Sequence, residues 1–366
     1  MMLPRVVFFL AFASANGAVD TSLQALANVG QEGRGNEAAT VAWKEVVSAG
    51  PSALPALLAT TGTGGIIADN WLRLAGDTIV ANAVRERRPV PTGEMESFVR
   101  KTTHASAARQ LAFDLLKQAD SSRAEALEPA LINDPVQELR RGAVQRVIDS
   151  ARTANGEASK AKWQEALAAV RDEDQTKLIT AELKKLGVAV DLPRHFGFLT
   201  KWHVIGPFDN TERKGFDTAF PPEAGVQLEA ALPGKEKEIK WIPFESSDEY
   251  GKIDLNKPLG MQKEATAYAV TSFESGDDRE VELRLGCKNA WKVWLNGELL
   301  FGRDEYHRGQ QMDQYKLKGR LKKGANTILV KCCQNEQKEE WTVEWEFQLR
   351  VCDAAGTAVL ASTTNR

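Results

Sequence analysis

The chain has 366 residues, of which 43% are hydrophobic, and a formal net charge of −3 at pH 7. A chain of this length suits two or three domains. The nearly balanced charge offers no electrostatic basis for binding nucleic acid or an anionic membrane surface.

The N-terminal residues have the pattern of an export signal. Arg5 supplies a short basic region, an apolar run extends from Val6 to Ala13, and Ala13-Ser14-Ala15 resembles a cleavage site. The apolar run is too short to span a bilayer. We therefore predict a signal peptide over residues 1–17, a secreted or periplasmic protein, and no membrane span after cleavage. The alternatives are a buried N-terminal helix and a membrane anchor.

From about Thr21 to Leu186 the apolar residues recur with the helical period. Asp134-Pro135 has the acidic and proline residues that mark the start of a helix. This pattern predicts an all-α array over residues 18–190, with short turns between the helices. The apolar positions that define the predicted faces are Trp43, Val46, Val47, Ile67, Trp71, Leu74, Ala108, Leu111, Ala112, Leu115, Leu116, Val136, Leu139, Ala143, Val144, Val147 and Ile148.

Two segments of this half, residues 52–58 and 133–148, resemble HEAT-type helical repeats. The resemblance lies in the Leu-Pro-Ala-Leu-Leu run and in the Asp-Pro turn that is followed by Val, Arg and Ala. It implies antiparallel helix pairs whose concave face binds other proteins. No constant period connects the two segments, so a HEAT-like solenoid and an irregular bundle both remain open. A spacer that positions the second half is an equally open interpretation.

The periodicity changes to two after Val190. Residues 191–196 read as a linker, and residues 197–355 contain short alternating segments with turns between them. Every odd position from Trp341 to Val351 is apolar, which predicts a half-buried antiparallel strand with its other face in solvent. Asn296-Gly297 between two apolar runs predicts a tight hairpin. The fold class expected here is an antiparallel β-sandwich, followed by a flexible tail over residues 356–366.

Three pieces of the second half are similar to the galactose-binding-like jelly-roll superfamily, whose members occur as sugar-binding modules beside glycoside hydrolases. They are Trp-His-Val-Ile-Gly-Pro-Phe-Asp-Asn at 202–210, Lys-Val-Trp-Leu-Asn-Gly-Glu-Leu-Leu at 292–300, and Leu-Lys-Lys-Gly-Ala-Asn-Thr-Ile-Leu-Val-Lys at 321–331. The resemblance spans roughly residues 197–353. It implies a jelly-roll fold and is only weakly specific for the ligand.

An outward aromatic side chain beside polar loops is the usual basis of sugar binding. Alternation along 291–295 places Trp294 on the face opposite to Trp291 and Val293, so Trp294 is a candidate stacking platform. The alternative is that Trp294 packs beneath a neighbouring loop. On the same pattern Trp202, Trp341 and Trp345 are predicted to be core residues.

The polar connection at residues 302–315 supplies four further candidates for ligand binding: Arg303, Tyr306, His307 and Arg308. Planar donors and a ring on one loop form a set that suits a sugar or a carboxylate. An ordinary solvated loop is the alternative interpretation. Asp209 and Asn210 are weak candidates for calcium, and an Asx turn is the more usual role of such a pair.

The motifs of known enzyme classes are not found. The sequence contains no Gly-x-Ser-x-Gly, no His-Glu-x-x-His and no phosphate-binding loop. Gly33-x-Gly35-x-x-Ala38 matches a weak dinucleotide fingerprint, but no predicted strand precedes it. We therefore predict no catalytic residues, no resident cofactor other than the weak calcium candidate, and a protein that is not an enzyme.

All four cysteines, Cys287, Cys332, Cys333 and Cys352, lie in the last third of the chain. In an oxidising compartment they permit up to two disulfides in three pairings. Cys332 and Cys333 point to opposite faces of a strand, so at most one of them is expected to meet a core cysteine. Four buried free thiols are the other possibility.

The function expected from these features is an exported, non-catalytic protein in which the β-sandwich binds carbohydrate and the helical half is a spacer or docking surface. One alternative is a protein-interaction scaffold, in which the helices bind an exported protein partner and the sandwich is structural. A second alternative is an accessory module of a carbohydrate-active enzyme system.

Overall fold

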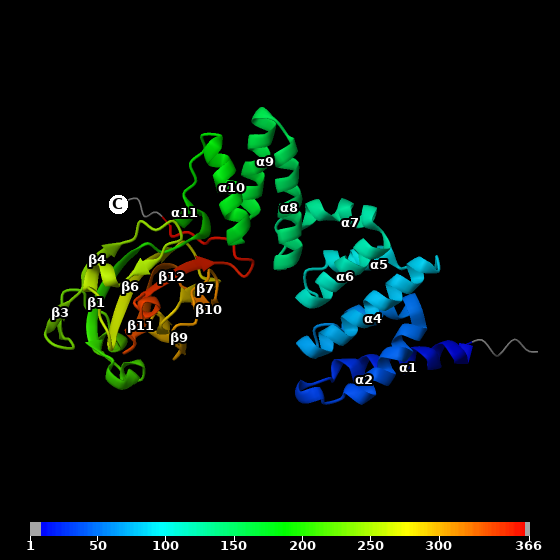
Figure 1. Cartoon of the computed structure of the whole chain (residues 1–366), viewed down its shortest axis with the longest axis horizontal. Helices are drawn as coiled ribbons and strands as arrows, with labels where there is room; N and C mark the ends of the chain where they lie inside the picture. The colour runs from blue at the N-terminus through cyan, green and yellow to red at the C-terminus, as the bar shows by residue number, and fades with distance from the viewer. Residues whose placement is uncertain (1–8, 363–366) are drawn as a thin grey trace, which may run out of the picture. The chain divides into compact units, whose positions relative to one another are not determined.

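The computed structural model describes residues 9–362, and only the backbone of residues 9–16. Contacts divide the chain into two compact units, Met1–Val170 and Arg171–Arg366, called here the helical unit and the β unit. Residues 1–8 of the predicted signal peptide at 1–17 lie outside the described residues, and the backbone of residues 9–17 begins the first helix. Within residues 9–362, there is no helix that is both long enough and apolar enough to cross a bilayer. The fold is mixed α plus β, as the change of period predicts (Figure 1).

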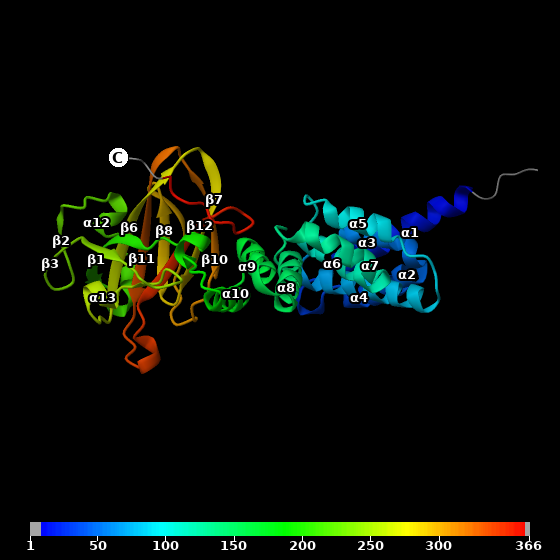
Figure 2. The same ribbon diagram turned by 90° about the horizontal axis from the view of Figure 1, so that it is seen from above.

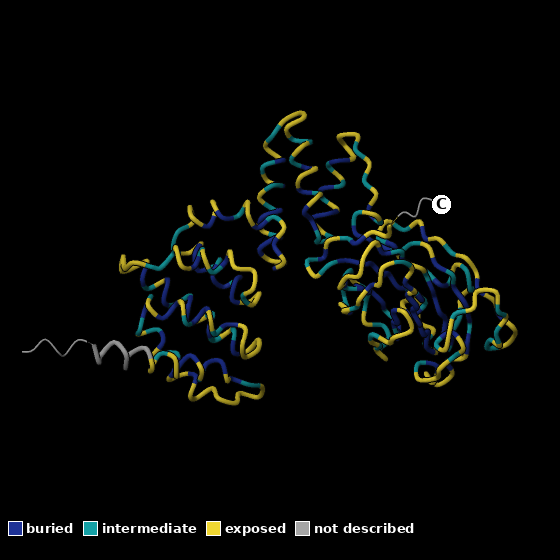
Figure 3. Tube along the Cα trace, turned by 180° about the vertical axis from the view of Figure 1, so that it is seen from behind, coloured by how far each residue is buried: buried dark blue, intermediate teal, exposed yellow. Residues whose placement is uncertain are grey.

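The helical unit is a stack of helices in which neighbours in the chain pack side by side (Figures 1 and 2). Its helices are α1 (Phe9–Ala27), α2 (Asn36–Ala49), α3 (Leu54–Thr60), α4 (Ile66–Arg85), α5 (Thr92–Arg100), α6 (Ser106–Ala119), α7 (Ser121–Leu127), α8 (Gln137–Thr153) and α9 (Gly156–Ala169), with short 3-10 turns at Gln31–Gly33, Gly50–Ala53 and Glu128–Leu131. The five apolar positions predicted for α6 are all buried. Figure 3 shows that buried residues follow one side of each helix in this unit.

The face predicted for α4 is correct only at Trp71, which is half-buried against the core of the helical unit. Ile67 and Leu74 are 37% and 52% exposed, whereas the buried side of the helix is built from small residues together with Leu72 and Ile79. Gly76 explains the difference, because a Cβ atom at this position would lie 3.0 Å from Leu115 Cδ1. Small side chains let α4 approach α6 closely, so the buried face of α4 carries alanines and a glycine, while the larger Ile67 and Leu74 lie outside the contact.

A buried ion pair lies inside the helical unit. Arg109 and Asp134 are 1% and 5% exposed, and Arg109 Nη1 donates to Asp134 Oδ1 at 2.7 Å. Arg109 Nε also donates to the carbonyl of Val99 at 2.8 Å. The Asp134 carboxylate accepts a hydrogen bond from the Val136 N–H as well (2.9 Å). Asp134 therefore joins the start of α8 to α6.

The β unit contains a six-stranded sheet in the order β4-β1-β6-β11-β8-β9, a four-stranded sheet in the order β10-β7-β12-β5, and a two-stranded β2-β3 ribbon (Figure 2). All of their pairings are antiparallel. The strands are β1 (Lys201–Asp209), β2 (Ala231–Pro233), β3 (Glu238–Lys240), β4 (Ile242–Glu245), β5 (Ile253–Asp254), β6 (Ala265–Ser275), β7 (Arg279–Cys287), β8 (Ala290–Leu295), β9 (Glu298–Arg303), β10 (Tyr315–Leu321), β11 (Gly324–Gln334) and β12 (Glu346–Cys352). The short helices are α10 (Glu173–Lys185), α11 (Leu192–Phe196), η4 (Thr211–Phe216), α12 (Pro221–Ala224), α13 (Asn256–Leu259) and η5 (Glu340–Thr342).

The two larger sheets share one apolar core. Trp202, Phe273 and Val293 of the six-stranded sheet contact the same buried cluster as Leu285 and Phe347 of the four-stranded sheet. Burying this shared face stabilises the unit by roughly 25 cal/mol for each Å² of apolar surface removed from water. Figure 3 shows the buried residues concentrated along these strands.

Two of the sequence motifs meet at one end of the β unit. Asn296 and Gly297 adopt φ values of 54° and 83°, which the predicted Asn-Gly hairpin between β8 and β9 requires. Asn296 Nδ2 donates to Asn326 Oδ1 at 2.8 Å. Asn326 is fully buried, and its side chain also accepts a hydrogen bond from the Lys322 N–H at 2.8 Å. The hairpin and the turn into β11 therefore form one hydrogen-bonded structure.

A segment of about thirty residues after β1, residues 210–241, covers the outer face of the six-stranded sheet. Lys331 of β11 is fully buried beneath it, and Lys331 Nζ bonds Glu223 Oε1 at 2.8 Å and the Phe216 carbonyl at 3.0 Å. Glu223 in turn accepts a hydrogen bond from the Tyr268 hydroxyl. Trp294 packs in the same outer cluster. The part of the sheet around Tyr268, Trp294 and Lys331 is thus buried on both faces.

The predicted strand from Trp341 to Val351 is corrected in two ways. Strand β12 begins only at Glu346, and Trp341 is 58% exposed on the turn η5, so Trp341 is not a core residue. Trp345 is fully buried, as predicted. The polar face of β12 is not in solvent, because Arg350 is fully buried and pairs with Asp313.

The contacts place the boundary between the units at Val170, whereas the change of sequence period lies near residue 190. The intervening helix α10 belongs with the β unit, where Lys177 Nζ lies 5.7 Å from the Tyr250 ring centroid. Residues 356–362, predicted as part of a tail, also pair with the β unit. The Ser362 N–H, for example, donates to the Glu274 carbonyl at 2.9 Å. The rest of that tail, residues 363–366, lies outside the described part of the chain.

Candidate functional site

The last residue of β9, Arg303, and the connection from β9 to β10 together hold four of the five residues predicted to bind a ligand. Its two arginines are engaged by one carboxylate, since Arg303 Nε and Arg308 Nε lie 2.9 and 3.5 Å from Glu305 Oε2. The hydrogen bond and charge of Arg303 hold the pKa of Glu305 below its usual range. The two exposed guanidinium groups therefore share one carboxylate, and a ligand would meet an ion-paired cluster rather than two free cations.

Tyr306 is half-buried and is held by polar contacts. Asn210 Nδ2 donates to the Tyr306 hydroxyl at 3.2 Å and to the Gln334 carbonyl at 2.9 Å. The guanidinium carbon of Arg213 lies 5.2 Å from the Tyr306 ring centroid. Burial raises the pKa of Tyr306, so its hydroxyl remains protonated at neutral pH. Tyr306 thus anchors the loop to Asn210 and Arg213 more than it presents a surface to solvent.

His307 and Trp341 form an edge-to-face pair. Their ring centroids are 5.1 Å apart, and the ring planes meet at 81°. His307 Nε2 lies 3.1 Å from Asn335 Oδ1, which fixes the orientation of the imidazole. Because Trp341 is 58% exposed, this pair presents an aromatic surface to solvent. Arg308 follows His307 in the chain and pairs with Glu305. We call His307, Trp341 and these two flanking residues the Trp341 face.

The exposed indole of Trp341 is attached to a firmly held turn. The next residue, Thr342, is fully buried, and its hydroxyl donates to the Gln337 and Glu339 carbonyls at 2.9 and 2.7 Å. Gln334 Nε2 and Lys263 Nζ each donate to the Thr342 carbonyl at 3.0 Å. The backbone beneath Trp341 is therefore fixed before any ligand arrives, which lowers the entropy cost of binding.

Trp294, the fifth predicted residue, lies away from this face. It is 6% exposed and packs in the outer cluster beneath residues 210–241, with its ring centroid 6.5 Å from that of Tyr268. A side chain with so little exposed surface cannot offer a ring face to a sugar. The structure places Trp294 in the packed position that the sequence left as the alternative.

The two weak calcium candidates have other partners. Asp209 Oδ1 accepts hydrogen bonds from the Thr211 N–H and hydroxyl at 3.3 and 2.7 Å, which is the geometry of an Asx turn. The Asn210 amide is fully buried and bonds Tyr306 and Gln334. Within residues 9–362, histidine, cysteine, aspartate and glutamate do not gather in groups of three or more that would suit a metal ion.

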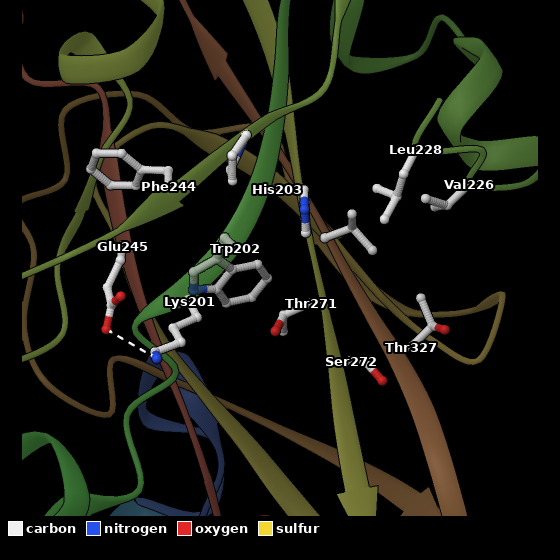
Figure 4. Close-up of a pocket in the computed structure, with 12 residues that line it drawn as sticks. Lys201, Trp202, His203, Val226, Leu228, Phe244, Glu245, Thr271, Ser272 and Thr327 are labelled. Atoms are coloured by element: carbon white, nitrogen blue, oxygen red, sulfur yellow. Dashed lines mark ion pairs between the residues drawn. The ribbon is translucent and has the colours of Figure 1, made fainter. Parts of the chain in front are cut away.

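A groove of about 630 Å³ lies where β1 and β6 separate (Figure 4). The pairing of these strands ends at His203 and Val270, whereas β1 continues beside β4 as far as Lys201. Lys201 and Glu245 form an ion pair at 3.4 Å at one side of the groove. Its walls combine apolar side chains with hydroxyls, and Figure 4 shows Val226, Leu228, Phe244, Thr271, Ser272 and Thr327 among them.

The groove lacks an exposed stacking surface. Trp202, which lines it, is 2% exposed, and Phe244 is half-buried and packs against the shared core. The groove could not be predicted from the sequence, because it arises from the separation of two strands that are far apart in the chain. Trp341 was also missed as a surface residue, because its position continues the apolar alternation of β12.

No family model and no curated protein matches the chain. Solved structures that resemble it include a GH31 alpha-xylosidase from Xanthomonas citri, with 10% identity and a TM-score of 0.20 over 43% of this chain and 16% of that one. Another is a beta-glucosidase from Kluyveromyces marxianus in complex with glucose, with 11% identity and a TM-score of 0.29 over 75% of this chain and 36% of that one. This chain therefore spans well under half of either structure.

Both similar structures are glycoside hydrolases, and this finding overturns the prediction that the chain is not an enzyme. That prediction is withdrawn. With TM-scores of 0.20 and 0.29, the likenesses assign neither a reaction nor a substrate to this chain.

Proposed function

We propose that the β unit binds carbohydrate and that the Trp341 face is where the sugar stacks. The observation that carries this proposal is the exposure of Trp341, at 58%, on a turn whose neighbouring residue is fully buried and hydrogen-bonded. Tryptophan is highly buried on average in folded domains, so an indole exposed on a firmly held turn is a candidate contact surface. Fixing it in one orientation is useful when a flat apolar surface must be ready for a ligand.

The chemistry around the indole suits a sugar. A pyranose presents an apolar C–H face and a rim of hydroxyl groups, so it needs an aromatic surface together with planar donors and acceptors. Trp341 would supply the surface. His307, Glu305 and Arg308 would supply groups that bond hydroxyls, with orientations already set by their mutual contacts. The groove of Figure 4 offers hydroxyls but no comparable ring, so we assign the sugar to the Trp341 face.

The proposal extends to the fold and to the cellular setting. We assign the β unit to the galactose-binding-like jelly-roll type, on the strength of the three sequence motifs and of two antiparallel sheets around one core. We interpret the helical unit as a HEAT-like spacer or docking surface. The signal-like N-terminus supports export to the periplasm or the exterior.

Titration of the full chain against a broad panel of soluble oligosaccharides and polysaccharides tests the proposal. For the ligand that binds the natural protein, Trp341→Ala should raise Kd about tenfold or more, which corresponds to ~1.4 kcal/mol. Trp341→Phe should retain more of the affinity, because it keeps an aromatic face.

Phe301→Ala is the matched control. Phe301 is a 50% exposed ring on β9 outside the Trp341 face, and its removal should leave Kd within about twofold. The melting temperature of each variant shows whether the fold is intact. Flat titrations across the panel would argue against carbohydrate binding. Equal losses in Trp341→Ala and Phe301→Ala would remove Trp341 from the site.

A further inference from the structure

The four cysteines of the β unit have different surroundings, and two of them are adjacent in space. Cys287 at the end of β7 and Cys332 on β11 are both 1% exposed, and their sulfur atoms are 3.8 Å apart. They belong to different sheets and both contribute to the core that the sheets share. A disulfide bond is about 2.05 Å long, so the two sulfurs need to approach by only about 1.8 Å, within the range of small side-chain rotations.

The remaining cysteines point elsewhere. Cys333 lies on the opposite face of β11, where its sulfur is 3.4 Å from the Thr266 hydroxyl. The Cys352 sulfur lies 3.6 Å from the Glu282 carbonyl, on the edge of β12 that faces β7. Of the pairings left open by the sequence, this geometry allows the Cys287–Cys332 bond and leaves Cys333 and Cys352 as thiols.

We infer that Cys287 and Cys332 form a disulfide that joins the two sheets when the chain folds in an oxidising compartment. A disulfide oxidant such as oxidised glutathione accepts the two electrons. The two thiols lose two hydrogen atoms and one S–S bond forms between the sheets, while the S–S bond of glutathione breaks to give two molecules of reduced glutathione.

The bond forms during folding rather than after it. Both sulfurs are shielded from any oxidant in the folded protein, and burial raises the pKa of the Cys332 thiol, so little reactive thiolate is present there. A folded, reduced sample should therefore resist oxidation. The same chain refolded in a glutathione buffer should acquire the bond, because its cysteines are accessible before the sheets close.

The bond would contact the segment that follows Trp341. The Trp345 indole N–H donates to the Cys332 carbonyl at 3.1 Å. Asn289, two residues after Cys287, donates through Nδ2 to the Glu344 carbonyl at 3.2 Å. The bridge joins β11, which leads into residues 335–345, to β7, which pairs with the following strand β12, and so supports the segment that carries Trp341. This consequence rests on the proposed function, whereas the existence of the bond does not.

Peptide mapping after refolding of the full chain tests the inference. The denatured, reduced protein is refolded in oxidised and reduced glutathione, its free thiols are alkylated under denaturing conditions, and it is digested with trypsin. The expected product is residues 285–288 joined to residues 332–338, with the peptide that carries Cys352 alkylated. Fragmentation of the linked peptide, and its retention in Cys333→Ser, assign the bond to Cys332.

Further measurements make the outcome decisive. Cys287→Ser should abolish the linked peptide, and the Tm of the oxidised natural chain should exceed that of its reduced form by about 5–15 °C. Four alkylated thiols after oxidative refolding, or a bond to Cys333 or Cys352, would overturn the inference. Because the mass of the linked peptide is independent of any sugar, its absence is distinguishable from a failure of carbohydrate binding.

Discussion

Asp313→Asn is expected to destabilise the β unit strongly. The Asp313 carboxylate lies between two buried arginines on the outer face of the four-stranded sheet. Arg350 donates to it through Nε and Nη2, both at 2.6 Å, and Arg284 Nη1 donates at 2.6 Å. The arginines are 0% and 6% exposed, and they stand opposite each other on β12 and β7.

The magnitude follows from the charge that the substitution leaves behind. Asparagine keeps the shape of the side chain but removes its negative charge, so Arg350 loses its ionic partner while Arg284 retains Glu282 at 2.7 Å. Breaking a buried ion pair by removing one partner typically costs about 3–5 kcal/mol. For a unit of this size, such a loss lowers Tm by roughly 6–20 °C.

Differential scanning calorimetry of the full chain at pH 7 provides the measurement, and Asp277→Asn provides the control. Asp277 is exposed in the turn after β6, so its substitution should change the free energy of unfolding by no more than ~0.5 kcal/mol. A loss below about 1 kcal/mol in Asp313→Asn would refute the reasoning. It would mean that water or rearranged side chains compensate the arginines.

The same carboxylate has a predictable effect on acid stability. Burial raises the pKa of Asp313, but the hydrogen bonds and charges of Arg350 and Arg284 outweigh it, so the pKa is lowered overall. A lowered folded-state pKa means that the carboxylate stabilises the fold above the unfolded-state value of about 4. This contribution is lost as the pH falls through the folded-state pKa. Asp313→Asn should lack this part of the acid dependence.

Three further substitutions test other parts of the chain. Asp134→Ala should destabilise the helical unit by about 3–5 kcal/mol, because it leaves the buried Arg109, 1% exposed, without its carboxylate partner. If the two units unfold separately, calorimetry should show this loss in a different transition from that of Asp313→Asn. Gly297→Ala places a Cβ at φ 83° in open space and should lower the free energy of unfolding by about 1–2 kcal/mol. Gly251→Ala, at φ 64°, also creates a contact of 2.5 Å with Phe198 Cβ and should cost about 1–3 kcal/mol more in urea unfolding. Equal losses at the two glycines would contradict the steric argument.

The secondary structure of the chain was predictable where one local rule decides it. The helical period defined the buried face of α6, and the Asn296-Gly297 pair defined the β8–β9 hairpin. Both depend on interactions within a few residues of the chain. The change from helices to strands was also visible, although α10 has a helical sequence and still packs with the β unit.

Polar residues on an alternating strand were misinterpreted. Arg350 occupies a position that the period of two assigns to solvent, and it is fully buried because Asp313, far away in the sequence, neutralises it. Alternation records which side chains are apolar. It does not record which polar side chains find a buried partner of opposite charge.

The candidate site was predictable only in part. The sequence of the polar loop identified Tyr306, His307 and Arg308 as candidates. The exposed ring of the site belongs to Trp341, which lies 34 positions after His307 and contacts it edge to face. Trp341 and Trp345 both occupy apolar positions of the two-residue alternation, so the pattern predicted both to be core residues. What separates them is the turn η5, which ends the alternation before β12 begins. Trp294 shows the opposite error, since residues 210–241 cover it.

The cover formed by residues 210–241 has a consequence for how this protein can diverge. Because Lys331 and Tyr268 are anchored to Glu223 beneath it, the covered part of the six-stranded sheet has no free surface on which new chemistry could be built. A substitution at Lys331 or Tyr268 disturbs packed neighbours. New specificity must therefore arise in the connections at the ends of the strands or in the groove of Figure 4, where a side chain can be exchanged without opening the interior.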